Sequence, residues 1–93
     1  MAATFLIPGA LRGLAGDRSE VRVDGAAATL GEAFGLLWGD CPGVRDRVLD
    51  ERGEVRPHVN VFVDGEDIRY AGGFGARLRG GAEILILPAV SGG

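Results

Sequence analysis

The order of sequence patterns along this chain predicts an α+β domain with a mixed sheet of four to five strands and one main helix packed on one face. Three observations support this fold class. Short apolar or alternating runs, typical of strands, occur both before residue 25 and after residue 58. A single long amphipathic helix pattern lies between them. The 93 residues contain no internal repeat and no linker long enough to separate two domains.

Two strands are expected before the helix. Residues 4–7 form an apolar run that ends at Pro8 and Gly9, because proline supplies no ladder donor and glycine favours a turn. Residues 20–23 alternate polar and apolar side chains, the pattern of a half-buried strand, and a turn signal at residues 24–25 follows.

The main helix is expected to begin at Thr29. Thr29 and Glu32 can form a capping box, in which each side chain satisfies a backbone N–H at the start of the helix. Apolar residues then follow at i, i+4, i+7 and i+8 as one helical stripe, which consists of Leu30, Phe34, Leu37 and Trp38. The helix should end near Asp40, since Pro42 cannot continue it, and residues 44–49 allow a further helical turn or two.

The second half of the chain is expected to supply the remaining strands. Residues 59–63 are the clearest strand because β-branched side chains dominate them, and residues 64–67 form the turn that follows. Residues 68–70 are predicted to be a short edge strand. The last strand covers residues 83–87 and follows a tight turn at residues 78–81.

Composition is that of an ordinary globular protein and narrows the choice of partners. Hydrophobic residues make up 46% of the chain and charged residues 25%. The net charge of −3 argues against nucleic acid, which needs clustered positive charge, and no apolar segment has the roughly 18–20 residues that span a membrane. A single cysteine fits a reducing cytoplasm, which is the expected location. All 10 basic residues are arginine, so the chain has no lysine amine to accept an isopeptide bond.

No constellation of residues predicts a catalytic or metal site. His58 is the only histidine, and Cys41 has no second cysteine with which to bind a metal. Cys41 is interpreted as a small packing residue, because no neighbouring base would activate its thiol. Residues 75–80 are not a phosphate-binding loop, since Gly81 occupies the position of the required lysine. The acidic side chains of residues 64–67 are assigned to the turn itself.

The last four residues of the chain are Val90, Ser91, Gly92 and Gly93. A diglycine has no side chains, tolerates nearly any backbone conformation and here carries the α-carboxylate. It can therefore thread a narrow enzyme channel and present the Gly93 carboxylate for chemistry. We expect a folded domain over residues 1–88 and a flexible tail over residues 89–93. The tail alone leaves an ordinary frayed terminus as the alternative.

The alternation of side chains along the predicted strands indicates a docking surface beside the tail. If the valines of residues 59–63 face the helix, Phe62 faces the opposite side of the sheet. In the last strand the isoleucines then point inward, and Leu85 and Leu87 point outward. The exposed apolar cluster of Phe62, Leu85 and Leu87 would dock a partner, unless a loop or a second copy of the chain covers it.

Taken together, these residues resemble the MoaD/ThiS family of small sulfur-carrier proteins, which have a ubiquitin-like β-grasp fold. The resemblance covers nearly the whole chain and is most specific in its C-terminal half. The segments that carry it are Ile7-Pro8 with Leu11-Arg12, residues 29–31, 42–44 and 59–63, residues 66–70 with Gly72-Gly73, and residues 86–93. The length and residues 57–73 are most similar to the CysO-type branch of cysteine biosynthesis. Ser91 replaces the family's usual alanine, a small-for-small change.

The resemblance implies a protein that serves as a substrate of other enzymes and binds no cofactor itself. An E1-like adenylyltransferase of the MoeB/ThiF type would use ATP and Mg²⁺ to convert the Gly93 carboxylate to an acyl-adenylate. A sulfurtransferase or sulfide donor would then leave a C-terminal thiocarboxylate. A downstream sulfur-incorporating synthase would use that sulfide for a metabolite such as cysteine or a thiosugar. Residues 90–92 would thread the enzyme channel while the apolar cluster docks on the partner.

Three other functions are open at this point. The chain could be the small subunit of a molybdopterin-synthase-type complex, a protein modifier joined to target lysines through Gly93, or a passive interaction module. Copurification with one large partner at fixed stoichiometry would favour the first, and covalent adducts of higher mass in cells would favour the second. Indifference to removal of Gly92 and Gly93 would favour the third.

Overall fold

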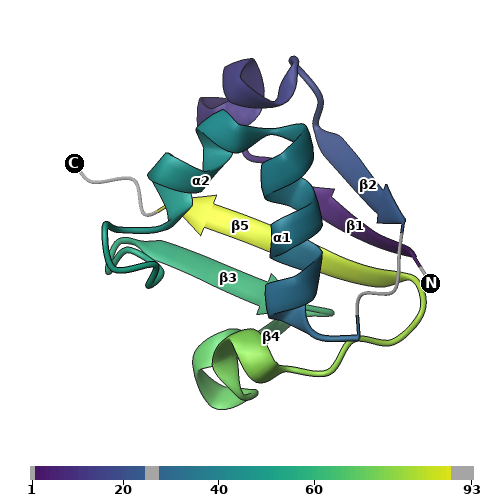
Figure 1. Cartoon of the computed structure of the whole chain (residues 1–93). Coiled ribbons are helices and arrows are strands. Elements are labelled where there is room, and N and C mark those ends of the chain that lie inside the picture. The colour runs from purple at the N-terminus through teal and green to yellow at the C-terminus, as the bar shows by residue number, and fades with distance from the viewer. Residues whose placement is uncertain (1, 25–27, 89–93) are drawn as a thin grey trace.

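The computed structural model describes residues 2–24 and 28–88 and contains a five-stranded mixed sheet with α1 lying across one face (Figure 1). Within these residues the strands are β1 (Ala2–Leu6), β2 (Glu20–Asp24), β3 (Val59–Val63), β4 (Glu66–Asp67) and β5 (Ala82–Pro88). The helices are α1 (Leu30–Asp40) and α2 (Pro42–Val48), and the 3₁₀ segments are η1 (Gly9–Ala15), η2 (Ile68–Tyr70) and η3 (Gly73–Gly75). The predicted fold class is confirmed.

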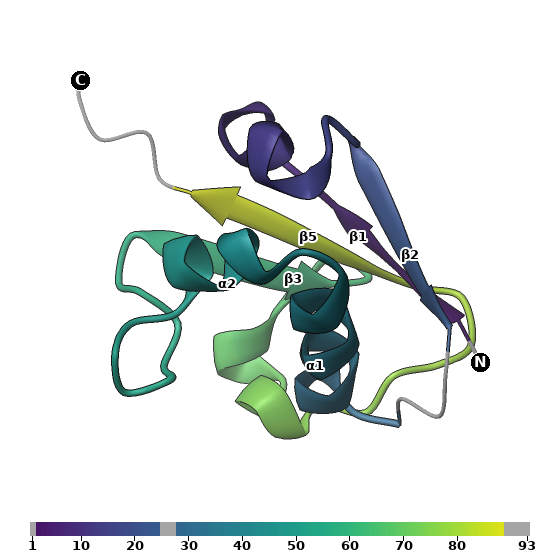
Figure 2. The same ribbon diagram turned by 45° about the horizontal axis from the view of Figure 1, so that its top comes forward.

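The strands lie in the order β2-β1-β5-β3-β4. β1 is antiparallel to β2 and parallel to β5, while β3 is antiparallel to both β5 and β4. The first and last strands of the chain are therefore neighbours in the middle of the sheet (Figure 1). Figure 2 shows α1 and α2 on the same side of that sheet.

The start of α1 has the capping box that the sequence predicts. The Glu32 backbone N–H donates to Thr29 Oγ1 at 3.3 Å, and the Thr29 N–H donates to Glu32 Oε1 at 3.1 Å. The helix ends at Asp40, and the Cys41 N–H closes its last turn on the Leu37 carbonyl at 2.7 Å. The helix boundaries therefore follow from local chemistry.

The core lies between α1 and the inner face of the sheet, with Phe34 at its centre. The Phe34 ring centroid lies 5.0 Å from that of Phe5, 4.9 Å from Trp38 and 5.8 Å from Phe74. Aromatic pairs at such separations stabilise a core beyond the area that they bury. No polar or charged side chain is buried in the described part of the chain, so the charged groups stay in contact with water.

The N-terminal half contains one segment that the sequence patterns did not indicate. After Pro8 the chain enters η1, where the Leu11 N–H donates to the Pro8 carbonyl at 2.9 Å. Gly16 ends this segment with a φ of 67°, a conformation that favours glycine. The first strand also begins and ends slightly earlier than residues 4–7, at Ala2 and Leu6.

The edge strand lies two residues earlier than predicted. Asp64 and Gly65 have φ angles of 48° and 87°, so the chain reverses at once and β4 begins at Glu66. Residues 68–70, predicted as a strand, form η2 instead. The Asp67 carboxylate accepts a hydrogen bond from the Arg69 N–H at 2.9 Å and so caps this 3₁₀ turn. The prediction of a strand at residues 68–70 is wrong.

Two further expectations concern membranes and the tail. Among residues 2–24 and 28–88, no helix has the length and apolar character that crossing a bilayer requires. The predicted tail, residues 89–93, lies outside the described residues, and β5 extends to Pro88, the last residue before it. The division into a domain over residues 1–88 and a flexible tail stays a prediction.

Replacing Thr29 by alanine should lower the free energy of unfolding by about 1 kcal/mol, because the Glu32 N–H loses its acceptor at the helix terminus. Urea denaturation at neutral pH measures this difference. Thr29→Ser keeps a hydroxyl at the same position and should lose much less. Equal stability of Thr29→Ala and the unchanged protein would show that the cap contributes nothing.

Candidate functional site

β5 connects the folded domain to the C-terminal residues, and it is held on both sides. On one side Ala82–Leu85 pair with β1, and on the other side the strand pairs with β3 as far as Pro88, which lies opposite Val59. Pairing with β3 therefore fixes the strand as far as Pro88. The predicted site residues Val90, Ser91, Gly92 and Gly93 lie outside the described residues.

The structure confirms the predicted alternation of side chains along β3 and β5. Ile84 and Ile86 are fully buried against the helices, whereas Leu87 is 42% exposed and Leu85 is half-buried. Phe62 is half-buried on the same outer face as Leu85, its direct cross-strand partner. Phe62, Leu85 and Leu87 thus lie on one face, and no segment of the described residues covers all of them.

A shallow groove extends this apolar face toward β1. Leu6 lies opposite Leu85 on the parallel strand β1, so the row of outward side chains continues from β3 across β5. The groove has a volume of about 290 Å³, and its lining consists of Leu6, Ile7, Pro8, Arg12, Ser19, Glu20, Leu85 and Leu87. We call the set Leu6, Phe62, Leu85 and Leu87 the outer apolar face.

Leu6 and Arg12 were not assigned to the site from the sequence. The alternation of Phe5 and Leu6 is the signal that could have placed Leu6 outward, once β1 was known to lie beside β5. Arg12 has no such signal. Its side chain reaches the groove because its Nε donates to the Ile7 carbonyl at 3.0 Å, which depends on the path of η1.

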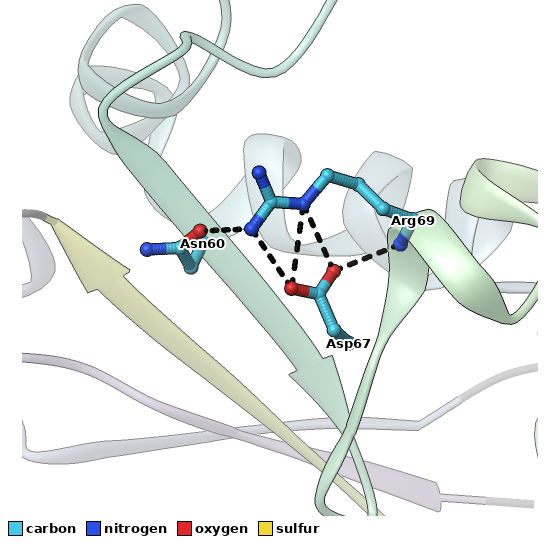
Figure 3. Close-up of polar contacts among 3 residues, drawn as sticks. All are labelled: Asn60, Asp67 and Arg69. Carbon is cyan, nitrogen blue, oxygen red and sulfur yellow. Dashed lines mark hydrogen bonds and ion pairs between the residues drawn. The ribbon is translucent and has the colours of Figure 1, made fainter.

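A polar cluster borders the outer apolar face on the β4 side (Figure 3). The Arg69 guanidinium donates to the Asp67 carboxylate, with Nη2 to Oδ2 at 2.9 Å and Nε to Oδ1 at 3.2 Å. Arg69 Nη2 also donates to Asn60 Oδ1, and Asn60 is the cross-strand partner of Leu87. Hydrogen bonds from Arg69 lower the pKa of the Asp67 carboxyl group. This cluster fastens η2 to β3 and limits the extent of the apolar surface.

Cys41 has the packing role that the sequence predicts. Its side chain is only 2% exposed, and Arg18 Nη2 donates to its Sγ at 3.1 Å. Burial is the largest effect on the thiol and raises its pKa, so the reactive thiolate is disfavoured. Asp64 likewise acts in the turn, where its carboxylate accepts a hydrogen bond from the Glu83 N–H at 2.9 Å. In residues 2–24 and 28–88 no cluster of three histidine, cysteine or acidic side chains could hold a metal ion.

The fold and the site together define a class of protein, a ubiquitin-like β-grasp domain whose central strand leads to a C-terminal Gly-Gly sequence. The comparison with known families identifies the family. The model of the ThiS family matches residues 5–93, a segment that includes both terminal glycines. The chain belongs to this ThiS/MoaD family of ubiquitin-like sulfur carriers.

Individual relatives agree with this assignment. The sulfur carrier protein CysO of Mycobacterium tuberculosis is 35% identical over 95 residues and covers 100% of both chains. Small archaeal modifier protein 1 of Haloferax volcanii is 40% identical over 81 residues, which are 86% of this chain and 87% of that protein. The crystal structure of that protein is similar with a TM-score of 0.85 and 33% identity over 100% of both chains.

A solved assembly also contains a similar chain. It is the crystal structure of the Amycolatopsis orientalis BexX/CysO complex, with a TM-score of 0.85 and 33% identity over 98% of this chain and 99% of that one. The resemblance to the MoaD/ThiS carriers and to their CysO-type branch is confirmed, as is the β-grasp fold. The relatives are named as carriers and modifiers, in keeping with a non-enzymatic role.

The ion pair between Asp67 and Arg69 should make the free energy of unfolding depend on pH in the acid range. A carboxyl group whose pKa is lowered on folding stabilises the native state above its ordinary pKa of 3.8, and this contribution is lost as the pH falls through the lowered native value. Asp67→Asn should therefore be less stable than the unchanged protein near neutral pH, and the difference should shrink once the pH falls below 3.8. Urea denaturation across this pH range measures it.

The exposed neighbour Glu66 provides the control for this experiment. Glu66 has no ion pair among the described residues, so Glu66→Gln should change the stability little at any pH. A stability difference for Asp67→Asn that is the same in acid and at neutral pH would show that charge is not its cause.

Proposed function

We propose that this chain is a sulfur carrier whose Gly93 carboxylate is adenylated by an E1-like enzyme and then converted to a thiocarboxylate. The observation that supports the proposal is the match to the ThiS family over residues 5–93, a range that includes Gly92 and Gly93. The described site agrees with it, because β5 is anchored up to Pro88 and leads directly toward these residues.

The proposed chemistry takes place on the terminal carboxylate, in two steps. A carboxylate oxygen attacks the α-phosphorus of ATP in the active site of an adenylyltransferase of the MoeB/ThiF type, and pyrophosphate leaves with Mg²⁺ neutralising its charge. Hydrosulfide then attacks the acyl carbon directly, or the outer sulfur of a sulfurtransferase persulfide attacks it and a thiol cleaves the S–S bond of the resulting acyl disulfide. AMP leaves, a C–S bond replaces the C–O bond, and the product is a thiocarboxylate.

The residue types of the C-terminus suit this chemistry. A carboxylate is a poor electrophile, so a good leaving group has to be attached before sulfur can attack, and Gly92 and Gly93 leave the reacting carbon uncrowded. Fully extended, residues 89–93 would span roughly 17 Å at about 3.4 Å per residue. This reach suffices for a buried active site while the folded domain stays outside the enzyme.

The outer apolar face is proposed as the docking surface for the adenylyltransferase. Two of its residues, Leu85 and Leu87, belong to β5, the strand that leads to the tail, so an enzyme that holds this face also positions the start of the tail. Apolar contact of this kind supplies affinity without fixing direction, and polar groups such as Asp67 and Arg69 at its border set the orientation. Phe62, Leu85 and Leu87, which the sequence predicts to dock a partner, form part of this proposed surface.

Delivery of the sulfur is proposed to serve cysteine biosynthesis. The support is the full-length similarity to CysO of Mycobacterium tuberculosis, at 35% identity. In this proposal a downstream sulfur-incorporating synthase binds the loaded carrier, and the thiocarboxylate sulfur displaces a leaving group from a carbon of the metabolite to form a thioester. Hydrolysis of the C–S bond to the carrier then releases the thiol product and regenerates the carboxylate of Gly93, so the chain can be loaded again.

A second candidate function is that of a protein modifier. It is favoured by the 40% identity to small archaeal modifier protein 1 over 81 residues. In that case the Gly93 acyl group would pass to a lysine amine of a target protein. Because this chain contains no lysine, its adducts would carry single copies rather than lysine-linked chains. Higher-mass adducts in cells, absent when Gly93 is deleted, would favour this function.

Sulfur loading should be visible as a change in intact mass. Incubation with a cognate E1-like adenylyltransferase, ATP, Mg²⁺ and sulfide should raise the mass by roughly 16 Da, because one oxygen is exchanged for one sulfur. Mass spectrometry of the intact chain measures the shift. Deletion of Gly93 should abolish it, because the carboxylate would then fall short of the reaction site by about 3.4 Å.

Cys41→Ser is the control for this loading reaction. The buried thiol takes no part in the proposed chemistry, so this variant should load sulfur like the unchanged protein. Loss of loading in a folded Cys41→Ser variant would make the thiol the carrier and would overturn the proposal.

The docking role of the outer apolar face can be tested with a matched pair of leucines. Leu87 is 42% exposed on this face, and Leu36 is 39% exposed on α1. Leu87→Glu should raise the KM of the adenylyltransferase for the carrier about tenfold, since an apolar contact of about 1.4 kcal/mol is lost. Leu36→Glu should leave the KM unchanged. Equal effects of the two substitutions would contradict docking on this face.

A further inference from the structure

A second surface near the end of β5 has a basic character. An open hollow of about 410 Å³ is lined by Asp46, Arg47, Arg56 and His58. Arg47 belongs to the last turn of α2, whereas Arg56 and His58 belong to the segment that leads into β3. We call these three basic residues the basic corner.

One residue of the basic corner, Arg56, is held in place by backbone carbonyls of α2. Arg56 Nε donates to the Asp46 carbonyl at 3.0 Å, which fastens the segment before β3 to the end of α2. The Arg56 N–H also donates to the Val48 carbonyl at 2.9 Å. The guanidinium of Arg56 therefore has a defined position beside α2 before any partner binds.

Neither Arg47 nor Arg56 forms a salt bridge within the described residues, although Arg56 interacts electrostatically with the Asp50 carboxylate. The ion pairs found there involve other arginines, and Asp46, the single acidic side chain of the hollow, lies 3.9 Å from Arg45. Arg47 is exposed to solvent, and so is His58. Two arginines and one aspartate line the hollow, so its formal charge is positive in a chain whose net charge is −3.

The basic corner lies at the base of the tail. His58 directly precedes Val59, and Val59 pairs with Pro88, the last described residue of β5. On the other side of β5, Arg12 lines the groove that contains Leu87. Basic side chains therefore flank the end of β5 on both its β3 side and its β1 side.

We propose that the basic corner binds an acidic surface of the adenylyltransferase at the entrance to the channel that takes up the tail, an inference that rests on the proposed function. An enzyme that receives the tail brings its channel entrance close to Pro88, and the basic corner adjoins Val59, the residue paired with Pro88. Complementary carboxylates there would steer the carrier so that the tail, rather than another part of the domain, meets the channel.

We expect the basic corner to bind an acidic protein surface rather than a small anion. The hollow is open, and its basic groups come from two separate segments instead of converging on one point with backbone N–H groups, as a phosphate site would require. The electrostatic attraction between the two surfaces is screened beyond the Debye length, which is about 8 Å at physiological ionic strength. Its effect should appear in KM and in the salt dependence of KM, and not in kcat.

Charge reversal at Arg47 tests the inference. Arg47→Glu should raise the KM of a cognate adenylyltransferase for the carrier about 3- to 10-fold at low ionic strength, and the KM should depend less on salt than that of the unchanged protein. Arg47→Lys keeps the charge and should retain a KM within about twofold. The matched control is Arg79→Glu, which changes the net charge equally on an exposed residue near the opposite end of β5.

His58→Glu is a second charge variant, chosen because it lies outside α2 and so does not disturb the helix that Arg47→Glu alters. His58 is exposed and makes no hydrogen bond with another side chain among the described residues, so this variant should fold like the unchanged protein and still raise the KM. Thermal unfolding of each variant verifies the fold. A KM that is unchanged in both Arg47→Glu and His58→Glu, or raised equally in Arg79→Glu, would overturn the inference.

The same assay separates this inference from the proposed function. If the unchanged protein gains no sulfur mass with any E1-like enzyme, the proposed function fails. If it is loaded normally and the two reversal variants load with the same KM, only the basic corner loses its proposed role.

Discussion

The pairing of β5 with β1 on one side and β3 on the other is the constraint on which the other features of this domain depend. β1 and β5 are parallel neighbours with β2 on one side of the pair and β3 on the other, so the chain has to pass over the sheet between β2 and β3, and α1 lies in that connection on the inner face. Burial of Ile84 and Ile86 under the helices then leaves Leu85 and Leu87 outward. The position of the central strand thus decides both what forms the core and what is presented beside the C-terminus.

The end of β5 has different chemical surroundings on its different sides. Leu87 and Leu85 provide an apolar surface on the outer face, while the basic corner lies where β3 begins. Apolar contacts contribute most of the affinity between proteins, but they discriminate poorly between orientations. Charged groups at fixed positions supply that discrimination. An enzyme that recognises both surfaces would fix the direction in which the tail leaves the domain.

Local chemistry explains which parts of the structure could be predicted from the sequence. The capping box of Thr29 fixed the start of α1, and the valine alternation of β3 fixed its inward and outward faces, because each signal is contained within a few residues. The prediction of a strand at residues 68–70 was wrong because the Asp67 carboxylate caps a 3₁₀ turn there, and this cap outweighs the strand propensity of the residues. The Asp67–Arg69–Asn60 cluster, by contrast, joins residues from separate elements, and no local pattern signals that they meet.

The same difference between local signals and contacts of distant elements applies to the candidate site. The outward positions of Phe62, Leu85 and Leu87 follow from parity within single strands. The contributions of Leu6 and Arg12 to the groove, and the meeting of Arg47 with His58, depend on how elements distant in sequence lie beside each other. Such proximity is a property of topology, so it became visible only with the sheet order.

The parallel arrangement of the first and last strands also has a mechanical consequence. A pull on the C-terminus acts along β5, and its hydrogen bonds to β1 and β3 lie across that direction. The bonds of both ladders would therefore be loaded together in shear, instead of opening one after another as in a hairpin that is peeled from its end. An enzyme could draw the C-terminal residues tightly into a narrow passage, and the load would be shared by the hydrogen bonds along the length of the central strand.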